Sequence, residues 1–391
     1  MAIPIDKKET LERMRALPQV RRWREGNYEP GGWFTAKPTE EGGIWGSWGH
    51  RFQPNRRRGV SMVELNRADR HPIPAEGLGL ISDREAGTEP DTPRYDYPLN
   101  QKYQVWSYNV ESLYEEAVSR QWSATRDIPW DKLEPLSDDQ ERALCQFVGF
   151  LHTVEFIPGD TLPFYMARVD PSFAEVRLFM SSQCADEARH MEVFGKRMYA
   201  NGGGPGMEPG AEALFQFDPR KSVLPEEAAR VIASVNPTLD FLAYSYFVQM
   251  IGEGVVLDFF RFGEFLGRNP CDKEMFRRIM QDEARHVSFG TMRIKYYLEN
   301  APRQEREAAS EMLHYLASVT ETSGAGFGLL VHPSAVEPFA LLAAGSTGNL
   351  DKGWDVVREF WAAVVEEYLD RCDRAGLPRR GRCMIPDEAP F

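Results

Sequence analysis

A five-residue segment, Asp-Glu-Ala-Arg-His, occurs twice in this chain of 391 residues, at positions 186–190 and 282–286. Both copies lie within stretches whose apolar residues recur at helical spacing. In a helix, a Glu and the His three positions after it lie on one face about a turn apart, so their side chains can bind one metal ion. A single Glu-x-x-His is common by chance, but only 7 histidines are present, and two of them occupy the same place in two copies of one motif. The candidate metal ligands of this repeat are Glu187, His190, Glu283 and His286.

The first copy has a matching glutamate on the preceding helical stretch. Two-metal helical bundles take one Glu from each of two helices and a Glu-x-x-His pair from each of two others. Between residues 143 and 157, only His152 and Glu155 are ionisable. Glu155 and Glu187 are equally distant from Pro171, which stands in an Asp-Pro turn signal, so an antiparallel hairpin brings them to one level. This predicts Glu155 as a metal ligand.

The second copy is preceded by a similar isolated glutamate. Glu253 is the only carboxylate between residues 240 and 258, in an apolar and aromatic stretch. The position midway between Glu253 and Glu283 falls in the segment 267–270, Gly-Arg-Asn-Pro, which combines a helix stop with a turn signal. Glu253 is therefore predicted as the fourth carboxylate ligand, and Glu264, nearer that turn, is the alternative.

Helical patterns dominate the chain from residue 105 onward, and no strand pattern of any length is present. A long connection runs from residue 200 to 237, with a short helix expected around 225–234. The predicted fold class is all-α: a four-helix bundle with one long crossover, extra C-terminal helices and an irregular N-terminal extension. Helices are expected near 107–121, 138–157, 172–200, 237–266, 271–299, 303–319 and 351–374.

Three regions of the chain differ in composition. Residues 1–104 are rich in Pro, Gly and Trp, lack a sustained helical period and are expected to form the irregular extension. Residues 105–320 form the predicted bundle, and residues 321–391 form a C-terminal loop and helix that pack on it. The extension carries the basic run Arg56–Arg58. This leaves open whether the extension wraps the bundle or provides a docking surface for a partner.

Composition excludes several classes of protein. The net charge of −13 argues against a general nucleic-acid binder, which needs a basic surface. No run of 18 apolar residues is present, so no membrane span is expected, and the N-terminus lacks the apolar core of a signal peptide. The 5 cysteines are scattered and include no Cys-x-x-Cys, which favours a reducing environment and predicts a cytoplasmic protein.

With its two Asp-Glu-Ala-Arg-His copies and two isolated glutamates, the segment 138–299 resembles the ferritin-like di-iron carboxylate proteins. The motif is similar to that of the oxygen-activating branch: bacterial multicomponent monooxygenase hydroxylases, the ribonucleotide reductase small subunit and related oxidases. The resemblance implies a ferritin-like bundle, two Fe ions (with Mn/Fe as the other metal pair) and O₂ as co-substrate. It implies that Glu187 and Glu283 bridge the two ions and that Glu155 and Glu253 are terminal ligands. His190 and His286 would each bind one ion.

The same resemblance implies roles for the residues beside these ligands. Four carboxylates and two neutral imidazoles carry −4, which two Fe²⁺ ions cancel, so that such a cluster is tolerable in a core. By the family's pattern, Asp186 and Asp282 each accept the outer N–H of the ligand histidine from the opposite motif. Arg189 and Arg285 hold these aspartates in place. His152, one turn before Glu155 on the same face, is either an extra metal ligand, a hydrogen-bond donor beside the ligands, or a hydrogen-bonded histidine of the core.

Three positions depart from patterns within the family. Phe194 stands where radical proteins of the reductase type carry a Tyr, Ile279 where arylamine N-oxygenases carry an extra His, and Leu257 where hydrocarbon hydroxylases carry a Thr. The expected function is an oxygen-dependent di-iron oxidoreductase, with a monooxygenase or N-oxygenase as the leading interpretation. A radical-generating or two-electron oxidase of the reductase-subunit type is one alternative, and an iron-storage protein is the other.

Expected partners follow from the same comparison. The chain has no G-x-G-x-x-G fingerprint and no cysteine cluster for an iron–sulfur centre, so an external electron donor is expected, either a ferredoxin or a flavin reductase. The substrate is expected to be a small organic molecule, and a homodimer is left open. Long segments before and after the bundle disfavour storage, because ordering them costs entropy that mineral storage does not require.

Overall fold

The computed structural model describes residues 6–35, 99, 101–200, 237–322 and 327–391. Within these ranges the chain is helical, and β structure is limited to isolated bridges, such as the one between Leu99 and Val169. This confirms the predicted all-α class. None of the described helices is both long and apolar enough to cross a membrane. The short helix predicted at 225–234 and the basic run Arg56–Arg58 lie outside the described residues.

The first hairpin of the bundle consists of α7 (Asp138–Val154), α8 (Phe156–Met166) and α9 (Ala174–Tyr199). The side chain of Ser137 accepts from a backbone N–H of the first turn of α7, which caps that helix. A single helix was predicted over 138–157; instead the helical path breaks at one residue after Val154 and continues as α8. Both α7 and α8 pack against α9.

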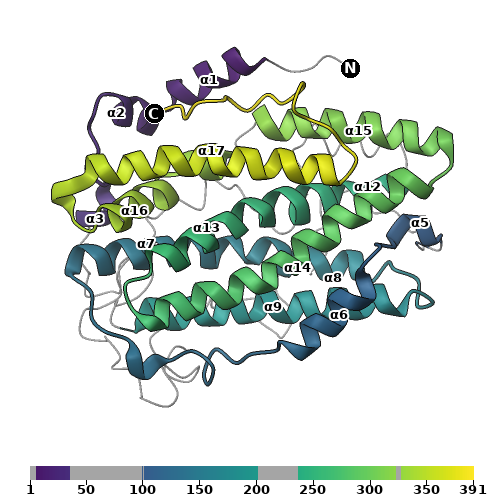
Figure 1. The fold of residues 1–391 in the computed structure, drawn as a ribbon, viewed down its shortest axis with the longest axis horizontal. Coiled ribbons are helices and arrows are strands. Elements are labelled where there is room, and N and C mark those ends of the chain that lie inside the picture. The colour runs from purple at the N-terminus through teal and green to yellow at the C-terminus, as the bar shows by residue number, and fades with distance from the viewer. Residues whose placement is uncertain (1–5, 36–98, 100, 201–236, 323–326) are drawn as a thin grey trace, which may run out of the picture.

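The second hairpin consists of α12 (Pro237–Tyr244), η3 (Ser245–Gly252), α13 (Glu253–Leu266) and α14 (Pro270–Asn300). The first three form one continuous helical stretch, in which η3 is π-helical. The sequence predicted this stretch as helix but did not indicate the π-helical turn. The Asn269 side chain caps α14 by accepting from the backbone N–H of Asp272 at 2.9 Å. Contacts of η3 and α13 with α14 hold the second hairpin together, and contacts of α14 with α9 join it to the first hairpin (Figure 1).

A second layer of helices covers one side of the bundle (Figure 1). It contains α15 (Arg303–Thr322), α16 (Pro333–Ala344) and α17 (Leu350–Arg374), with the short turns η4 (Phe327–Val331) and η5 (Thr347–Asn349). The sequence predicted mostly loop over 321–349, whereas α16 is a buried helix that packs between α7 and α17. A Cβ at Gly353 of α17 would overlap the carbonyl oxygen of Ala340, so glycine is required where α16 and α17 meet.

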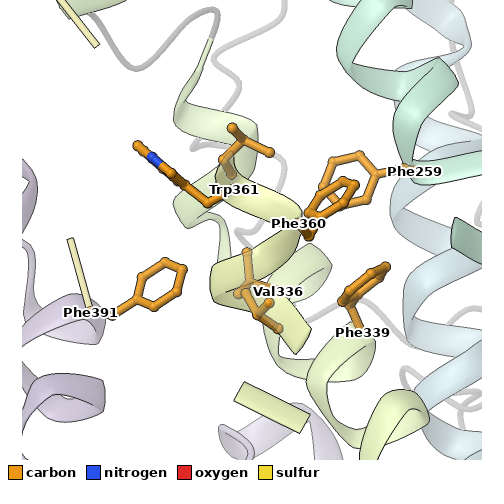
Figure 2. A pocket seen from close by; sticks show the side chains of 8 residues that line it. Phe259, Val336, Phe339, Phe360, Trp361 and Phe391 are labelled. Atoms are coloured by element: carbon orange, nitrogen blue, oxygen red, sulfur yellow. The ribbon is translucent and has the colours of Figure 1, made fainter. Parts of the chain in front are cut away.

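Aromatic side chains fill the interface between the two layers. Phe259 of α13 lies 4.9 Å from Phe360 of α17, measured between ring centroids, and Phe360 lies 4.9 Å from Phe339 of α16. Figure 2 shows these rings gathered at one end of a small apolar pocket that Val336 and Phe391 also line. Because α13 carries a predicted metal ligand, this interface attaches the outer layer to a ligand helix.

The N-terminal segment departs from the predicted irregular extension. Residues 7–24 form two helices, α1 (Lys7–Ala16) and α2 (Pro18–Arg24), followed by the short turn α3 (Gly32–Thr35). The segment lies across the outer layer beside the C-terminal chain (Figure 1), where Trp23 contacts the ring of Trp354 at 4.8 Å. The predicted division at residue 104 stays a prediction, since residues 36–98 lie outside the described part of the chain.

One buried carboxylate holds this N-terminal segment in place. Glu337 of α16 is 2% exposed and accepts hydrogen bonds from the indole N–H groups of Trp23 at 3.1 Å and Trp33 at 2.9 Å. It also accepts from the backbone N–H of Gly31 at 2.8 Å and pairs with the guanidinium of Arg22. Four donors from one segment therefore converge on a single side chain.

We expect Glu337→Ala to release this segment. Without the carboxylate, two buried indoles and one backbone N–H lose an acceptor, and a partly buried guanidinium loses its counter-charge. The free energy of unfolding should fall by about 3 kcal/mol, measured by urea denaturation, and trypsin should cleave α1 and α2 faster. Glu9→Ala is the control, because Glu9 only pairs with Arg13 on the surface of α1 and should cost less than about 1 kcal/mol. Equal losses in both variants would contradict the anchor.

Candidate metal centre

The structure brings all six predicted ligands together inside the bundle. Two of them stand at irregular points of their helices: Glu155 is the residue between α7 and α8, and Glu253 is the first residue after the π-helical η3. The other four come from uninterrupted helices. These are Glu187 and His190 on α9, and Glu283 and His286 on α14.

The six side chains form two overlapping groups. Within each group, one possible ligand atom from every residue lies within 4.8 Å of the others. The shared members are Glu187 and Glu283, which is the arrangement that two bridging carboxylates require. Glu155 and Glu253 each belong to one group only, as terminal ligands do. The first group consists of Glu155, Glu187, His190 and Glu283, and the second of Glu187, Glu253, Glu283 and His286.

The donor atoms of this cluster fit a pair of metal ions. Buried polar atoms normally have hydrogen-bond partners, because leaving them unpaired is costly. Here seven buried atoms, at least one from each of the six residues, have none. Carboxylate oxygens and imidazole nitrogens are the donors that iron and manganese sites use. The unpartnered atoms are Glu155 Oε1, both carboxylate oxygens of Glu187, His190 Nδ1, Glu253 Oε2, Glu283 Oε2 and His286 Nδ1.

The outer nitrogens of the two histidines face aspartates of the opposite motif. His190 Nε2 lies 3.3 Å from Asp282 Oδ2, and His286 Nε2 lies 3.2 Å from Asp186 Oδ2. An Nε2–H that donates to a carboxylate leaves the Nδ1 lone pair directed into the cluster, which is the tautomer a metal ligand needs. This crossed pairing is the one that the family resemblance implied.

Two arginines stand outside the aspartates and contact both of them. Arg189 pairs with Asp186 of its own motif and reaches Asp282 Oδ2 at 3.4 Å. Arg285 pairs with Asp282 and reaches Asp186 Oδ2 at 3.3 Å. Each aspartate is therefore held in position by two guanidiniums and one imidazole.

Sequence reasoning missed one neighbour of the site. Trp122, in the segment after α6 (Val110–Ser119), donates its indole N–H to Asp282 Oδ2 at 2.7 Å. This places an indole, a carboxylate and the His190 imidazole in one hydrogen-bonded series. The guanidinium of Arg189 lies over the indole ring, 5.4 Å from its centroid. No spacing rule links Trp122 to the motif, because α6 reaches α9 only through tertiary packing.

Other residues singled out from the sequence lie beside the cluster or away from it. His152 is in neither group of ligand atoms, and burial lowers its pKa to about 4, so it is neutral at neutral pH. Glu264, the alternative to Glu253, is also absent from both groups. A residue that was not among those predicted for the site, Cys184, is half-buried one turn before Glu187, and burial together with that carboxylate raises the pKa of its thiol to about 11.

Burial dominates the electrostatics of the two terminal glutamates. It raises the pKa values of Glu155 and Glu253 well above the ordinary 4.5, and the neighbouring histidines only partly oppose this. For Glu187, burial acts in the same direction but is outweighed by His190 and His286, so that its pKa is lowered. For His190, burial lowers the pKa, but Glu155 and Asp282 outweigh it, and the pKa rises well above 6.5. Without metal ions, the cluster therefore retains protons that metal ions would displace.

We expect the protein to bind about two metal ions per chain. His190→Ala or His286→Ala should reduce this toward one or none, because each imidazole belongs to one group. Glu155→Ala and Glu253→Ala should also weaken binding, whereas the control Glu264→Ala should not. Elemental analysis after loading with Fe²⁺ measures the ratio. Full metal content in both histidine variants, or loss in Glu264→Ala with retention in Glu253→Ala, would refute the ligand assignment.

The stability of the metal-free protein should decrease as pH rises. Above pH 4.5, an ordinary glutamate loses its proton in the unfolded chain, while Glu155 and Glu253 keep theirs in the folded protein. Above pH 6.5 the same holds for His190 and His286. His152 and His314, whose pKa values burial lowers to about 4, oppose this effect between about pH 4 and 6.5. Above pH 6.5 these two histidines are neutral in both states, and the folded state binds more protons than the unfolded state, so the free energy of unfolding falls with pH.

Denaturation of chelator-treated protein at a series of pH values measures this slope. The double variant Glu155→Gln with Glu253→Gln removes two of the responsible groups and should flatten it. Saturating metal ions should oppose the trend, because they bind the deprotonated ligands. A free energy of unfolding that rises with pH above pH 6.5 would contradict the assignment.

No protein-family model matches this sequence, and no curated protein does. Solved structures with a similar fold include R2-like ligand-binding oxidases. One, with an aerobically reconstituted Mn/Fe cofactor, has 21% sequence identity and a TM-score of 0.50, over 69% of this chain and 93% of its own. Another, with an aerobically reconstituted metal cofactor after photoconversion, has 21% identity and a TM-score of 0.50, over 69% and 94%. A variant with an anaerobically reconstituted Mn/Fe cofactor has 22% identity and a TM-score of 0.50, over 69% and 93%.

At this level of identity, the likeness shows the fold. The chain therefore has the ferritin-like, all-α fold of the R2-like oxidases, with a buried carboxylate and histidine cluster at its centre that is compatible with two metal ions.

Proposed function

We propose that the protein is an oxygen-dependent oxidoreductase that uses two metal ions, Fe/Fe or Mn/Fe, to oxidise a small organic substrate. The observation that carries this proposal is the pair of ligand groups that share Glu187 and Glu283. Seven buried donor atoms in these groups have no hydrogen-bond partner, while His190 Nδ1 and His286 Nδ1 lie 3.1 and 3.2 Å from carboxylate oxygens of the same cluster. The fold neighbours, which are oxidases with reconstituted Mn/Fe cofactors, support the same class of chemistry.

When bound, the metal pair supplies the electrons that reduce O₂ and the oxidising power that acts on the substrate. The chain's own residues hold and insulate that pair. Glu187 and Glu283 fix the spacing of the two sites, and the aspartates keep the histidines in the tautomer that presents Nδ1. All six candidate ligands are buried, which excludes bulk water from the reacting region.

Apolar rings beside His190 support oxidation of an organic molecule. Phe260 lies 6.5 Å from the imidazole and 5.9 Å from Phe194, measured between ring centroids. Phe194 is fully buried and has no hydroxyl group, so it cannot form the tyrosyl radical that reductase small subunits store. These rings favour direct substrate oxidation, with monooxygenation or N-oxygenation as the leading reactions.

A two-electron or radical-generating oxidase is the second candidate function. It is favoured by Trp122, an oxidisable ring joined through Asp282 to His190 by contacts of 2.7 and 3.3 Å. Such a series can carry an electron toward the metal pair from a donor outside the bundle. In either case we propose that the electrons come from a separate ferredoxin or flavin reductase.

Reaction with O₂ distinguishes these functions. Protein loaded anaerobically with Fe²⁺ and mixed with O₂ should give a transient optical signal that His286→Ala lacks, because the second ligand group is then incomplete. With isotopically labelled O₂ and a panel of small apolar and aromatic substrates, an oxygenase places the label in the product. An oxidase places it only in water.

The iron content separates an enzyme from a storage protein. A storage protein accumulates hundreds of irons per assembly, whereas an enzyme retains about two per chain. The absence of any oxygen-dependent signal in protein that holds two Fe²⁺ ions would overturn the proposed function.

A further inference from the structure

Two buried glutamines stand behind the terminal ligand Glu253. Gln183 on α9 lies one turn before Glu187, and Gln249 in η3 lies one turn before Glu253. Gln183 Nε2 donates to Glu253 Oε1 at 2.7 Å, and Gln249 Nε2 donates to Gln183 Oε1 at 3.1 Å. Both side chains are fully buried. We call Gln183 and Gln249 the carboxamide pair.

The second glutamine determines which end of the first one faces the ligand. A carboxamide presents an N–H₂ donor at one end and a carbonyl acceptor at the other, and the two ends have nearly the same shape. Because Gln249 donates to Oε1 of Gln183, Nε2 of Gln183 must turn toward Glu253. The opposite orientation would set a carbonyl oxygen against a carboxylate oxygen, which is repulsive. Gln249 therefore acts on Glu253 through Gln183.

The hydrogen bond leaves Glu253 with one uncommitted oxygen. Oε1 is bound by the amide, while Oε2 is buried and has no hydrogen-bond partner. From this geometry we infer that the carboxamide pair holds Glu253 as a ligand that binds one metal ion through Oε2 alone. This inference rests on the proposed two-metal function.

The position of Gln249 is itself fixed by the π-helical segment and by α14. Gly290, one turn after His286, lies directly against it: a Cβ at Gly290 would stand 2.6 Å from Gln249 Cβ and 3.1 Å from the Ser245 carbonyl oxygen. Only glycine lets η3 approach α14 this closely. π-Helical turns occur often at functional sites, and here the turn brings the amide of Gln249 to the level of α9.

The carbonyl oxygen of Gln249 shows that the pair is retained at a cost. Gln249 Oε1 is buried and has no hydrogen-bond partner, and an unpaired buried carbonyl is destabilising. A leucine would fill a similar volume without that cost. What the site requires of Gln249 is therefore its N–H₂ group, which orients Gln183. Neutral donors suit this place, because a charged donor would disturb the balance between four carboxylates and two divalent ions.

Gln249→Leu is the decisive variant, because it removes the orienting donor and leaves the side chain that donates to Glu253, Gln183, unchanged. Gln183→Leu removes the hydrogen bond to Glu253 directly. Each variant is loaded anaerobically with Mössbauer-active Fe²⁺, and its spectrum and iron affinity are compared with the wild type. At saturating iron both should hold about two ions per chain, with one of the two iron signals shifted. The affinity for that ion should fall about 10- to 100-fold, as for other residues that orient a metal ligand.

Gln146→Leu is the matched control. Gln146 is a fully buried glutamine of α7 whose amide atoms have no hydrogen-bond partner, and it belongs to neither ligand group. Its replacement should leave both iron signals unchanged, so that loss of a buried amide as such is distinguished from loss of the carboxamide pair. Gln249→Met, which keeps the unbranched shape without the donor, serves if Gln249→Leu does not fold.

The outcomes separate this inference from the proposed function. Two bound irons with wild-type spectra in the Gln249 variant would overturn the inference and leave the function intact. A shift in Gln183→Leu but not in the Gln249 variant would also overturn it, because Gln249 would then not act through Gln183. Failure of the wild-type protein to bind iron would overturn the proposed function as well.

Discussion

The burial of four glutamates at the centre of one helical bundle is the constraint on which the rest of this structure depends. Carboxylates this close repel one another and have lost their hydration, so the cluster is stable only with bound protons or bound metal ions. The surrounding side chains form layers of alternating character: carboxylates inside, then imidazoles, then aspartates, then guanidiniums. Each layer is paired with the next by contacts such as His286 to Asp186 at 3.2 Å and Asp186 to Arg285 at 3.3 Å. In this arrangement each charged or polar group faces a group of complementary charge or hydrogen-bonding character. The central carboxylates are therefore not in direct contact with apolar side chains alone.

Regular helices position the motif residues of this cluster, and irregular points of helices position the isolated glutamates. The two motif copies lie on α9 and α14, which run without interruption for 26 and 31 residues and so hold Glu and His at fixed helical spacing. The isolated glutamates stand where helices deviate, Glu155 between α7 and α8 and Glu253 at the end of the π-helical η3. A helical break leaves some backbone groups without their usual partners, which is tolerated only when the surrounding structure stabilises it. Here the deviations bring each carboxylate to the level of the motif on the facing helix.

This division explains how much the sequence could predict. The sequence could predict that the motif residues lie together because helical spacing is a local property. It could place the isolated glutamates beside them because antiparallel hairpins relate residues by their distance from a turn. The all-α class and most helix bounds followed from the same periodicity. The break at Glu155, the π-helical turn and the helices at 7–24 did not follow, because tertiary contacts and not local propensity select them. Trp122 and the carboxamide pair were also missed, since their partners lie far away in the sequence, as Gln183 and Glu253 do.

The outer layer has a physical role in the site as well. Arg371 of α17 is buried against α13, where a Cβ at Gly254 would lie 2.8 Å from its guanidinium carbon. Its Nη1 also lies 3.7 Å from Asp258 Oδ2, which gives a second attachment between α17 and α13. Gly254 directly follows Glu253, so the helix that begins with this ligand is held by α17 on its outer side, as η3 and α14 hold it from within. The outer helices, which Glu337 in turn ties to the N-terminal segment, thus stabilise the position of Glu253. A bundle without this layer would leave α13 supported on one side only, at the residue where its backbone passes from π-helix to α-helix.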